Sequence, residues 1–464
     1  MYTVTINEKK YSYENIMYLK DIANELGITC FVAKVNNRLR ELSYYVNYDC
    51  RIDFLNLDEY EAVRVYETSL RYLTIMALEK LYPGIDVKVF QCVSSSISFH
   101  VKDFVGEIDS QFIKRLEKKM QELIFLDLPI TRRKVSKEEA FALYSQRDYL
   151  DKTDVLKYRP EDTVNLYECD GYINYMFGYM VPSTKYLSQF KLRLYYPDFV
   201  IQYPRGELNG EIPEFEDSAK FGKMLMEARE WAITCESDSI AKMNKHVENN
   251  TTVEFVNMCE TKHNNMLAEL GLSIKRQIEH IRLIAIAGPS SSGKTTFSNR
   301  LRIELMTRGI HPVKISMDDY YNNRENAPLD ENGEPDLEHI ESLDIDLFNR
   351  DLLALIQGKT VTLPKFDFAL GRRVIGKTIK IDKDQPIIIE GIHALNERLT
   401  SLIPKHQKYK IYISPLTQIN IDDHSPIGAT DIRLLRRIVR DARTRNSPAE
   451  DTLSMWSSVR RGEF

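Results

Sequence analysis

One short segment, Gly288-Pro-Ser-Ser-Ser-Gly-Lys-Thr295, constrains this chain more than any other part of it. It satisfies the pattern GxxxxGK[ST]. The segment follows a continuous apolar run at 282–287 and precedes a stretch with helical spacing at 296–308. Because a strand buried on both faces has such an apolar run, this setting predicts a strand–loop–helix unit of a parallel α/β sheet. Further apolar runs of this kind lie at 312–316, 386–390 and 409–413.

A loop of this composition is suited to bind phosphate groups. Its glycines let successive backbone N–H groups point inward at phosphate oxygens. The side chain of Lys294 can reach the β- and γ-phosphates of a nucleotide, and the Thr295 hydroxyl is a magnesium ligand. A plain Ser/Gly turn is the alternative interpretation. We expect ATP and Mg²⁺ as cofactors, with the nucleotide held by Gly288, Pro289, Ser290, Ser291, Ser292, Gly293, Lys294, Thr295 and Thr296.

Acidic residues follow two of the predicted strands. Glu390 ends one apolar run, and Asp318 and Asp319 come just after another. An acid at the carboxyl edge of a parallel sheet lies beside the nucleotide crevice, so Glu390 is suited to bind magnesium directly or through water. One of the two aspartates can accept a proton from an attacking hydroxyl. Capping for Glu390 and plain loop positions for the aspartates are the alternatives.

Near the C-terminus, a predicted helix is rich in arginine. Spacings of three and four residues place Arg433, Arg436, Arg440 and Arg443 roughly on one face. A solvated basic helix is the usual explanation of such a run. Beside an ATP site, an arginine lid that clamps the transferring phosphoryl group is the other. We expect Arg436 and Arg440 to act with Lys294 in catalysis, Arg445 to bind the nucleotide and Arg433 to contact the substrate.

Composition limits the remaining classes of protein. The 464 residues suggest several domains, and 28% charged residues with a net charge of -5 argue mildly against general nucleic-acid binding. We expect no membrane span, because no run of about eighteen apolar residues occurs, and no signal peptide, because the N-terminus reads as a strand. Six scattered cysteines without a CxxC pair favour reduced thiols and a cytoplasmic location. A homo-oligomer is also expected.

The motifs from Leu283 onward, taken in order, resemble the uridine kinase/phosphoribulokinase family of P-loop kinases. Ser316-Met-Asp-Asp-Tyr-Tyr321 resembles the segment that bears the catalytic base, which implies that Asp318 is the general base and Tyr321 a nucleoside contact. Ile389-Glu-Gly391 matches the acidic magnesium motif, which implies that Thr295 and Glu390 bind the metal. The arginine-rich helix matches the lid.

Three positions depart from the pattern of uridine kinases. Glu338, in the segment that resembles the family's ribose-binding stretch, stands where Asp is usual. Lys365-Phe-Asp-Phe368 resembles a base-contacting Tyr-Asp-Phe, with Phe366 in place of Tyr, and the histidine that follows it in the family falls on Gly371. We expect Glu338, Phe366 and Phe368 to contact the substrate. Related kinases continue beyond the lid, so we also expect a shortened kinase domain.

The N-terminal half resembles two modules of threonyl-tRNA synthetases. Residues 1 to about 57 resemble the TGS domain, a β-grasp module, and those from about 59 to 204 resemble the second additional domain, which hydrolyses mischarged tRNA. The metal-binding positions of that domain fall on Thr68, Tyr72, Cys169 and Ile173, of which only the cysteine is a ligand type. A metal site needs about three such ligands, so we expect a scaffold or binding module without hydrolytic chemistry.

The expected fold is therefore α/β: a C-terminal P-loop kinase with a parallel sheet, preceded by a β-grasp domain and an α+β synthetase-editing-like domain. The expected divisions are 1–57, 58–217, a helical connector at 218–280 whose last helix breaks near Gly271, and 281–464. The expected reaction is transfer of the γ-phosphoryl group of ATP to a nucleoside 5′-hydroxyl, uridine first and cytidine second. Alternatives are a kinase for a sugar phosphate or pantothenate-like acceptor, and an RNA-binding protein gated by nucleotide.

Overall fold

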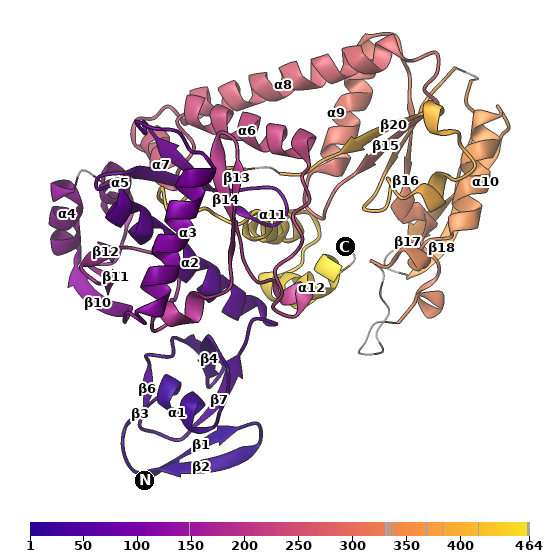
Figure 1. Ribbon diagram of the computed structural model, residues 1–464. Helices are drawn as coiled ribbons and strands as arrows, with labels where there is room; N and C mark the ends of the chain where they lie inside the picture. The colour runs from indigo at the N-terminus through magenta and orange to yellow at the C-terminus, as the bar shows by residue number, and fades with distance from the viewer. Residues whose placement is uncertain are drawn as a thin grey trace. The chain divides into compact units, whose positions relative to one another are not determined.

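The computed structural model describes residues 1–461 except 148, 330–332, 334–335, 337, 368–369, 383 and 416. The chain forms two compact units (Figure 1). The first unit contains Met1–Thr252 together with the short segment Thr417–Ile427. The second unit begins at Val253 and contains the rest of the chain.

The first unit begins with a small sheet in the order β2-β1-β7-β4-β5. Its first two strands form the expected antiparallel hairpin, and β1 pairs in parallel with β7. Helix α1 contributes Leu19, Ile22 and Ala23 to the core against buried strand residues such as Val4 and Ile52. The elements are β1 (Tyr2–Ile6), β2 (Lys9–Tyr13), β3 (Met17–Tyr18), α1 (Leu19–Glu25), β4 (Val32–Val35), β5 (Arg38–Arg40), β6 (Tyr45–Val46) and β7 (Cys50–Leu55).

The larger part of the first unit is organised around the long helix α2 (Tyr60–Leu81). Most of its residues are buried, as expected of a helix covered on several sides. One antiparallel sheet has the order β13-β14-β9-β8 and another the order β10-β11-β12. Their elements are β8 (Asp86–Gln91), β9 (Ile97–Lys102), α3 (Ser110–Phe125), β10 (Thr131–Ser136), α4 (Lys137–Gln146), α5 (Leu150–Tyr158), β11 (Thr163–Cys169), β12 (Tyr172–Asn174), β13 (Lys191–Tyr195) and β14 (Asp198–Gln202).

Three helices follow: α6 (Ala219–Thr234), α7 (Ile240–Glu248) and α8 (Thr252–Arg276). The sequence predicts a break in the third near Gly271, and this prediction is wrong because α8 is continuous. A Cβ atom at Gly271 would lie 2.7 Å from Cγ of Glu304 on α9 (Lys294–Thr307). The glycine therefore allows the two helices to pack closely; it does not end the first one.

The second unit contains the predicted parallel sheet, in the order β16-β19-β15-β20. All three strand pairs are parallel, and the buried apolar strands β15 (Leu283–Ala287) and β19 (Ile387–Glu390) lie in the middle. The remaining elements are β16 (Val313–Ser316), α10 (Ile345–Ile356), β17 (Val361–Asp367), β18 (Arg372–Ile379), β20 (Lys408–Tyr412), α11 (Ala429–Thr444) and α12 (Ala449–Arg461). Short 3₁₀ turns link several of them, including Met317–Tyr320 after β16.

The segment Thr417–Ile427 is held inside the first unit by charged and polar contacts. Asp422 forms a buried ion pair with Lys152, whose Nζ lies 2.8 Å from Oδ1. Asp423 pairs with Lys88 at 3.1 Å and with Lys102 at 2.7 Å. These pairs bind the segment to three different elements, α5, β8 and β9.

His424 lies at the centre of this segment. Its Nδ1 is 2.9 Å from the Asn174 side-chain nitrogen, and its carbonyl oxygen accepts from Arg71. Burial, followed by the positive charge of Lys152, holds the pKa of His424 well below its usual value, so the ring is neutral. The residue therefore has a structural role in a buried polar network.

The Lys152–Asp422 pair gives a stability test. In Lys152→Met, Asp422 stays buried without its cation, and we expect the free energy of unfolding of the first unit to fall by about 3–5 kcal/mol. Lys245→Met is a matched control, because the Lys245–Asp154 pair is partly exposed and should contribute at most about 1 kcal/mol. The chain has two tryptophans. With Trp456 changed to Phe, urea unfolding followed by Trp231 fluorescence reports on the first unit. Equal losses in the two variants would contradict the prediction.

Candidate functional site

The glycine-rich loop connects β15 to α9 at the carboxyl edge of the parallel sheet. Gly293 has φ of 96°, a conformation that favours glycine, immediately before the first residue of α9. A Cβ atom at Gly288 would lie 2.0 Å from the carbonyl oxygen of Ile413, just after the neighbouring strand β20. The loop can follow this path only because both positions lack a side chain. Its backbone N–H groups and the N-terminus of α9 form an anion-binding concavity.

Polar groups in the loop fit a polyphosphate. The Lys294 Nζ donates to the carbonyl oxygens of Gly288 at 2.8 Å and Pro289 at 3.1 Å, so it lies across the loop. The hydroxyl oxygens of Ser291 and Ser292 are buried and have no hydrogen-bond partner in the described part of the chain. Buried hydroxyls normally have partners, so the loop offers donors that phosphate oxygens can satisfy.

Thr295 and Glu390 come together at the edge of the sheet. The Thr295 hydroxyl oxygen lies 3.0 and 3.2 Å from the two carboxylate oxygens of Glu390, which is buried. Lys314 Nζ is 3.4 Å from the same carboxylate. Among the described residues no group of three or more His, Cys, Asp or Glu could hold a metal ion. A hydroxyl beside a buried carboxylate fits Mg²⁺, which keeps waters and phosphate oxygens as ligands and needs few from the protein.

The two aspartates after β16 have different surroundings. Asp318 as a whole residue is exposed to solvent, but many protein atoms surround its carboxyl group. This partial burial, together with the negative charge of Glu390, raises the pKa of Asp318 to about 6. Asp319 instead accepts a hydrogen bond from the backbone N–H of Phe366 at 3.3 Å, which anchors β17. The geometry thus favours Asp318 as the acid in the site and Asp319 as a structural residue.

Aromatic and polar residues border the site on the acceptor side. The rings of Tyr321 and Phe366 meet edge to face, with centroids 5.6 Å apart. Burial, followed by the charges of Asp318 and Glu338, raises the pKa of the Tyr321 hydroxyl. Nε2 of His393 lies 2.8 Å from the carbonyl oxygen of Glu338. Phe368, which the sequence also assigns to the substrate, lies outside the described residues.

Helix α11 brings arginines to the loop. Arg433 Nε donates to the carbonyl oxygen of Ser290 at 3.2 Å, and Arg436 Nε to that of Ser291 at 3.1 Å. Arg440 and Arg445 instead approach Asp441, the former with Nη2 at 2.7 Å and the latter with Nε at 3.7 Å from Oδ1.

Two other arginines of the helix differ from the expected face. Arg443 is exposed, whereas Arg437 is buried and its Nη1 donates to the Ser290 hydroxyl oxygen at 2.8 Å. Arg437 is not among the site residues predicted from the sequence. The spacing of four residues from Arg433 was the available signal, since it places both on one side of the helix.

In the first unit, packed side chains occupy the positions at which the resemblance to synthetases places metal ligands. Tyr72 is fully buried, stacks edge to face on Tyr172 at 5.1 Å and donates to the carbonyl oxygen of Tyr172 at 2.8 Å. The Thr68 hydroxyl accepts from Arg71 at 3.2 Å. Cys169 is buried, and burial raises the pKa of its thiol to about 11. These residues serve the core of the unit.

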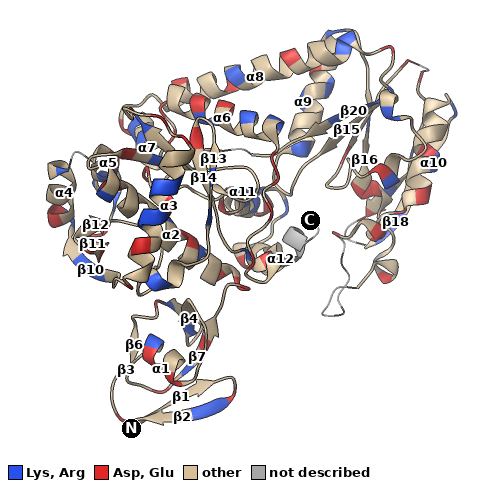
Figure 2. Cartoon of the chain, in the orientation of Figure 1, with Lys and Arg blue, Asp and Glu red and all other residues tan. Residues whose placement is uncertain are grey.

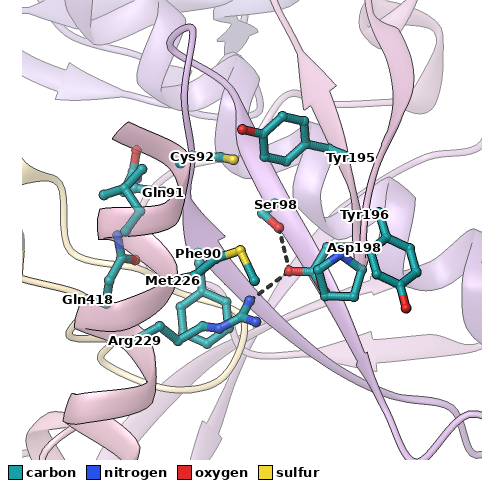
Figure 3. Close-up of a pocket in the computed structure, with 13 residues that line it drawn as sticks. Phe90, Gln91, Cys92, Ser98, Tyr195, Tyr196, Asp198, Met226, Arg229 and Gln418 are labelled. Carbon is teal, nitrogen blue, oxygen red and sulfur yellow. Dashed lines mark hydrogen bonds and ion pairs between the residues drawn. The ribbon is translucent and has the colours of Figure 1, made fainter. Parts of the chain in front are cut away.

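A small pocket in the first unit also contains a buried carboxylate (Figure 3). Asp198 accepts from the Ser98 hydroxyl at 3.1 Å and from Arg229 at 2.7 Å, and it lies 2.7 Å from Nδ1 of His100. These contacts hold the pKa of Asp198 below its usual value, against the effect of burial. The carboxylate is engaged in cross-linking β9, β14 and α6.

The chain resembles two different kinds of known protein, a kinase family and threonine–tRNA ligases. Residues 283–464 match the model of the "Phosphoribulokinase / Uridine kinase family". A threonine–tRNA ligase of Rubrobacter xylanophilus is 31% identical over 179 residues, which are 38% of this chain and 28% of the ligase. The chain thus spans less than a third of the length of that relative. No helix in the described residues is long and apolar enough to cross a membrane.

Two solved structures overlap the chain in part. A possible uridine kinase from Bacillus stearothermophilus has 20% identity and a TM-score of 0.25, covering 30% of this chain and 80% of that one. A putative fructose transport system kinase from Silicibacter has 19% identity and a TM-score of 0.30, covering 42% of this chain and 93% of that one.

A closer relative is the uridine kinase of Macrococcus caseolyticus. It is 32% identical over 178 residues, which are 38% of this chain and 77% of that protein. Together with the family model, this relative supports an ATP-dependent kinase. The chain belongs to the phosphoribulokinase/uridine kinase family.

Proposed function

We propose that this chain transfers the γ-phosphoryl group of ATP to the 5′-hydroxyl of a nucleoside, uridine first and cytidine second. The observation that carries the proposal is the position of Asp318. Its carboxyl group lies near Glu390 and Lys294, whose charges act on it, and next to the aromatic residue Tyr321. An acid that lies between a phosphate-binding loop and an aromatic side chain is suited to remove the proton from a hydroxyl that attacks a phosphoryl group.

Each residue then has a defined part in the transfer. Asp318 accepts the proton of the acceptor hydroxyl as the bond to phosphorus forms. Lys294, Arg436 and Arg440 stabilise the negative charge that develops on the transferring group. The nucleotide is oriented by the backbone of Gly288–Gly293 and by the hydroxyls of Ser290–Ser292. Thr296 and Arg445 are further nucleotide contacts. Thr295 and Glu390 would hold Mg²⁺, which supplies charge neutralisation at the phosphates when bound.

The acceptor is assigned to the side bordered by Tyr321, Phe366 and Glu338, with Arg433 and Phe368 as further substrate residues. Aromatic side chains bind the flat face of a base, and a carboxylate accepts hydrogen bonds from ribose hydroxyls. The name of the Macrococcus relative supports uridine. Glu338, Phe366 and Gly371 are the positions at which acceptor preference could differ from that of uridine kinases.

We propose that the chain divides into domains at 1–57, 58–217, 218–280 and 281–464. We also propose that the protein is cytoplasmic and forms a homo-oligomer. The first unit is proposed as a scaffold or binding module. Figure 2 shows acidic and basic residues interspersed along α8, without a stripe of one sign. With a net charge of -5, this mixture favours a small-molecule acceptor over a long nucleic acid.

The acceptor can be identified by measuring ATP consumption by the full chain with Mg²⁺. We expect turnover with uridine, slower turnover with cytidine, and none with ribulose 5-phosphate or pantothenate. Turnover with only one of the latter two would overturn the nucleoside assignment while leaving a kinase. No turnover at all, combined with tRNA binding that weakens steeply with salt, would favour the nucleotide-gated RNA-binding alternative.

Asp318→Asn tests the general base. The amide keeps the shape of the side chain but accepts no proton, so we expect kcat to fall by about a hundred- to ten-thousandfold. ATP affinity, measured by calorimetry without acceptor, should change little. Asp319→Asn is the matched control, since its amide oxygen can still accept from Phe366 N–H and most turnover should remain. Near-full turnover of Asp318→Asn would show that another group removes the proton.

A further inference from the structure

One buried carboxylate gathers the arginines of helix α11. Asp441 is 1% exposed. Its Oδ1 lies 2.8 Å from Nε and 2.7 Å from Nη2 of Arg440, and 3.7 Å from Nε of Arg445. Its Oδ2 lies 3.3 Å from Nε of Arg437. The proposed kinase reaction leaves this residue without a part, although it contacts three cationic side chains of the lid.

Arg437 extends this contact to the phosphate loop. Its side chain is buried between Asp441 and Ser290. Nε lies 3.3 Å from Asp441 Oδ2 without a hydrogen bond to it, and Nη1 donates to the serine hydroxyl oxygen at 2.8 Å. A buried guanidinium needs a counter-ion, because its charge is poorly hydrated there. Asp441 supplies that charge, at ion-pair distance from Arg437.

Helix α12 holds the carboxylate from the other side. The Thr452 hydroxyl, which is fully buried, lies 3.4 Å from Oδ2 of Asp441. The turn between the helices closes on the same residue, since the Arg445 and Ser447 N–H groups donate to the Asp441 carbonyl oxygen at 3.0 and 3.2 Å. The Trp456 ring lies 5.5 Å from the Arg433 guanidinium carbon. Contacts with α12 and with the turn between the two helices therefore restrain both Asp441 and Arg433.

We propose that Asp441 is a positioning residue for phosphoryl transfer: it is the shared counter-ion that holds Arg437, Arg440 and Arg445 in register with the phosphate loop. The inference rests on the proposed function only in that a nucleoside triphosphate occupies the loop. It does not depend on which hydroxyl compound accepts the phosphoryl group.

Two opposing effects decide the outcome of removing the charge. Without the carboxylate the lid becomes more positive, which favours a polyphosphate through long-range attraction. At the same time the three guanidinium groups, of which that of Arg437 is buried, lose the partner that orders them, and bidentate contacts to phosphate depend on that order. The long-range attraction is screened by solvent and salt at an open site, so the loss of order should dominate.

The test is Asp441→Asn in the full chain. ATP affinity is measured by calorimetry without acceptor, and kcat and KM for each substrate are measured by ATP consumption with whichever acceptor the wild type uses. We expect ATP affinity and kcat each to fall by about tenfold or more, as is usual when a buried charge pair loses one partner. The KM for the acceptor at saturating ATP should be unchanged, and Asp441→Glu should recover part of the loss.

Glu304→Gln is the matched control. Glu304 forms an ion pair at the same helical spacing with Arg308, at 2.6 Å, but near the end of α9 remote from the loop. We expect its ATP affinity and turnover to equal those of the wild type. A purely structural role for Asp441 would lower the unfolding temperature and leave ATP affinity and kcat of the folded protein unchanged.

Three outcomes separate this inference from the proposed function. If Asp441→Asn binds ATP as tightly as wild type or more tightly and keeps its kcat, Asp441 does not position the arginines. If wild type binds ATP but phosphorylates no nucleoside, the proposed acceptor is wrong, whereas the effect of Asp441 on ATP affinity still decides this inference. If wild type binds no ATP, both proposals fail.

Discussion

The hydrogen bond between Thr295 and Glu390 is the contact around which the candidate site is arranged. It joins the first turn of α9 to the last residue of β19, at 3.0 Å. The two residues are far apart in the sequence but adjacent in space, because β15 and β19 pair in parallel with Ile286 opposite Glu390. The same pairing on the other side of β19 sets Ser316 opposite Glu390 and so brings Asp318 to the same edge. Sheet register thus places the phosphate loop, the metal pair and the candidate base together.

The cost of this arrangement is an accumulation of negative charge at one edge of the sheet. Glu390 is buried, and its charge contributes to raising the pKa of Asp318 to about 6. Lys314 and Lys294 offset part of the repulsion, the first by an ion pair with Glu390 and the second by its charge near Asp318. The lid has the opposite imbalance, with an excess of arginines around Asp441. Bound Mg²⁺ and triphosphate would have to balance both, which is a common electrostatic logic of phosphoryl-transfer sites.

The first unit also buries polar and charged groups, and it pairs them with other groups of the protein. Where the synthetase-like pattern has metal-binding positions, this chain has Thr68, Tyr72 and a packed Cys169. The Tyr72 hydroxyl donates to a backbone carbonyl, and the Thr68 hydroxyl accepts from Arg71. The segment Thr417–Ile427 adds its own buried charges, each matched by a lysine. Because an unpaired buried charge is expensive, these ion pairs specify one register for the segment.

Local sequence patterns determined a large part of this protein. The glycine-rich loop, its flanking strand and helix, and the acids at strand ends were all predictable, because loop conformation and strand burial depend on nearby residues and on hydrophobic period. Three features were decided only by tertiary structure. Gly271 reads as a helix break but serves close packing against Glu304. Residue spacing alone leaves the adjacent acids Asp318 and Asp319 equivalent, and the hydrogen bond from Phe366 N–H to Asp319 separates them. Arg437 is buried and contacts Ser290 of the loop, whereas Arg443 is exposed, because the packing of α11 decides which of its faces is covered. In each case the deciding contact joins residues distant in sequence or depends on how a helix is oriented, and no local pattern encodes it.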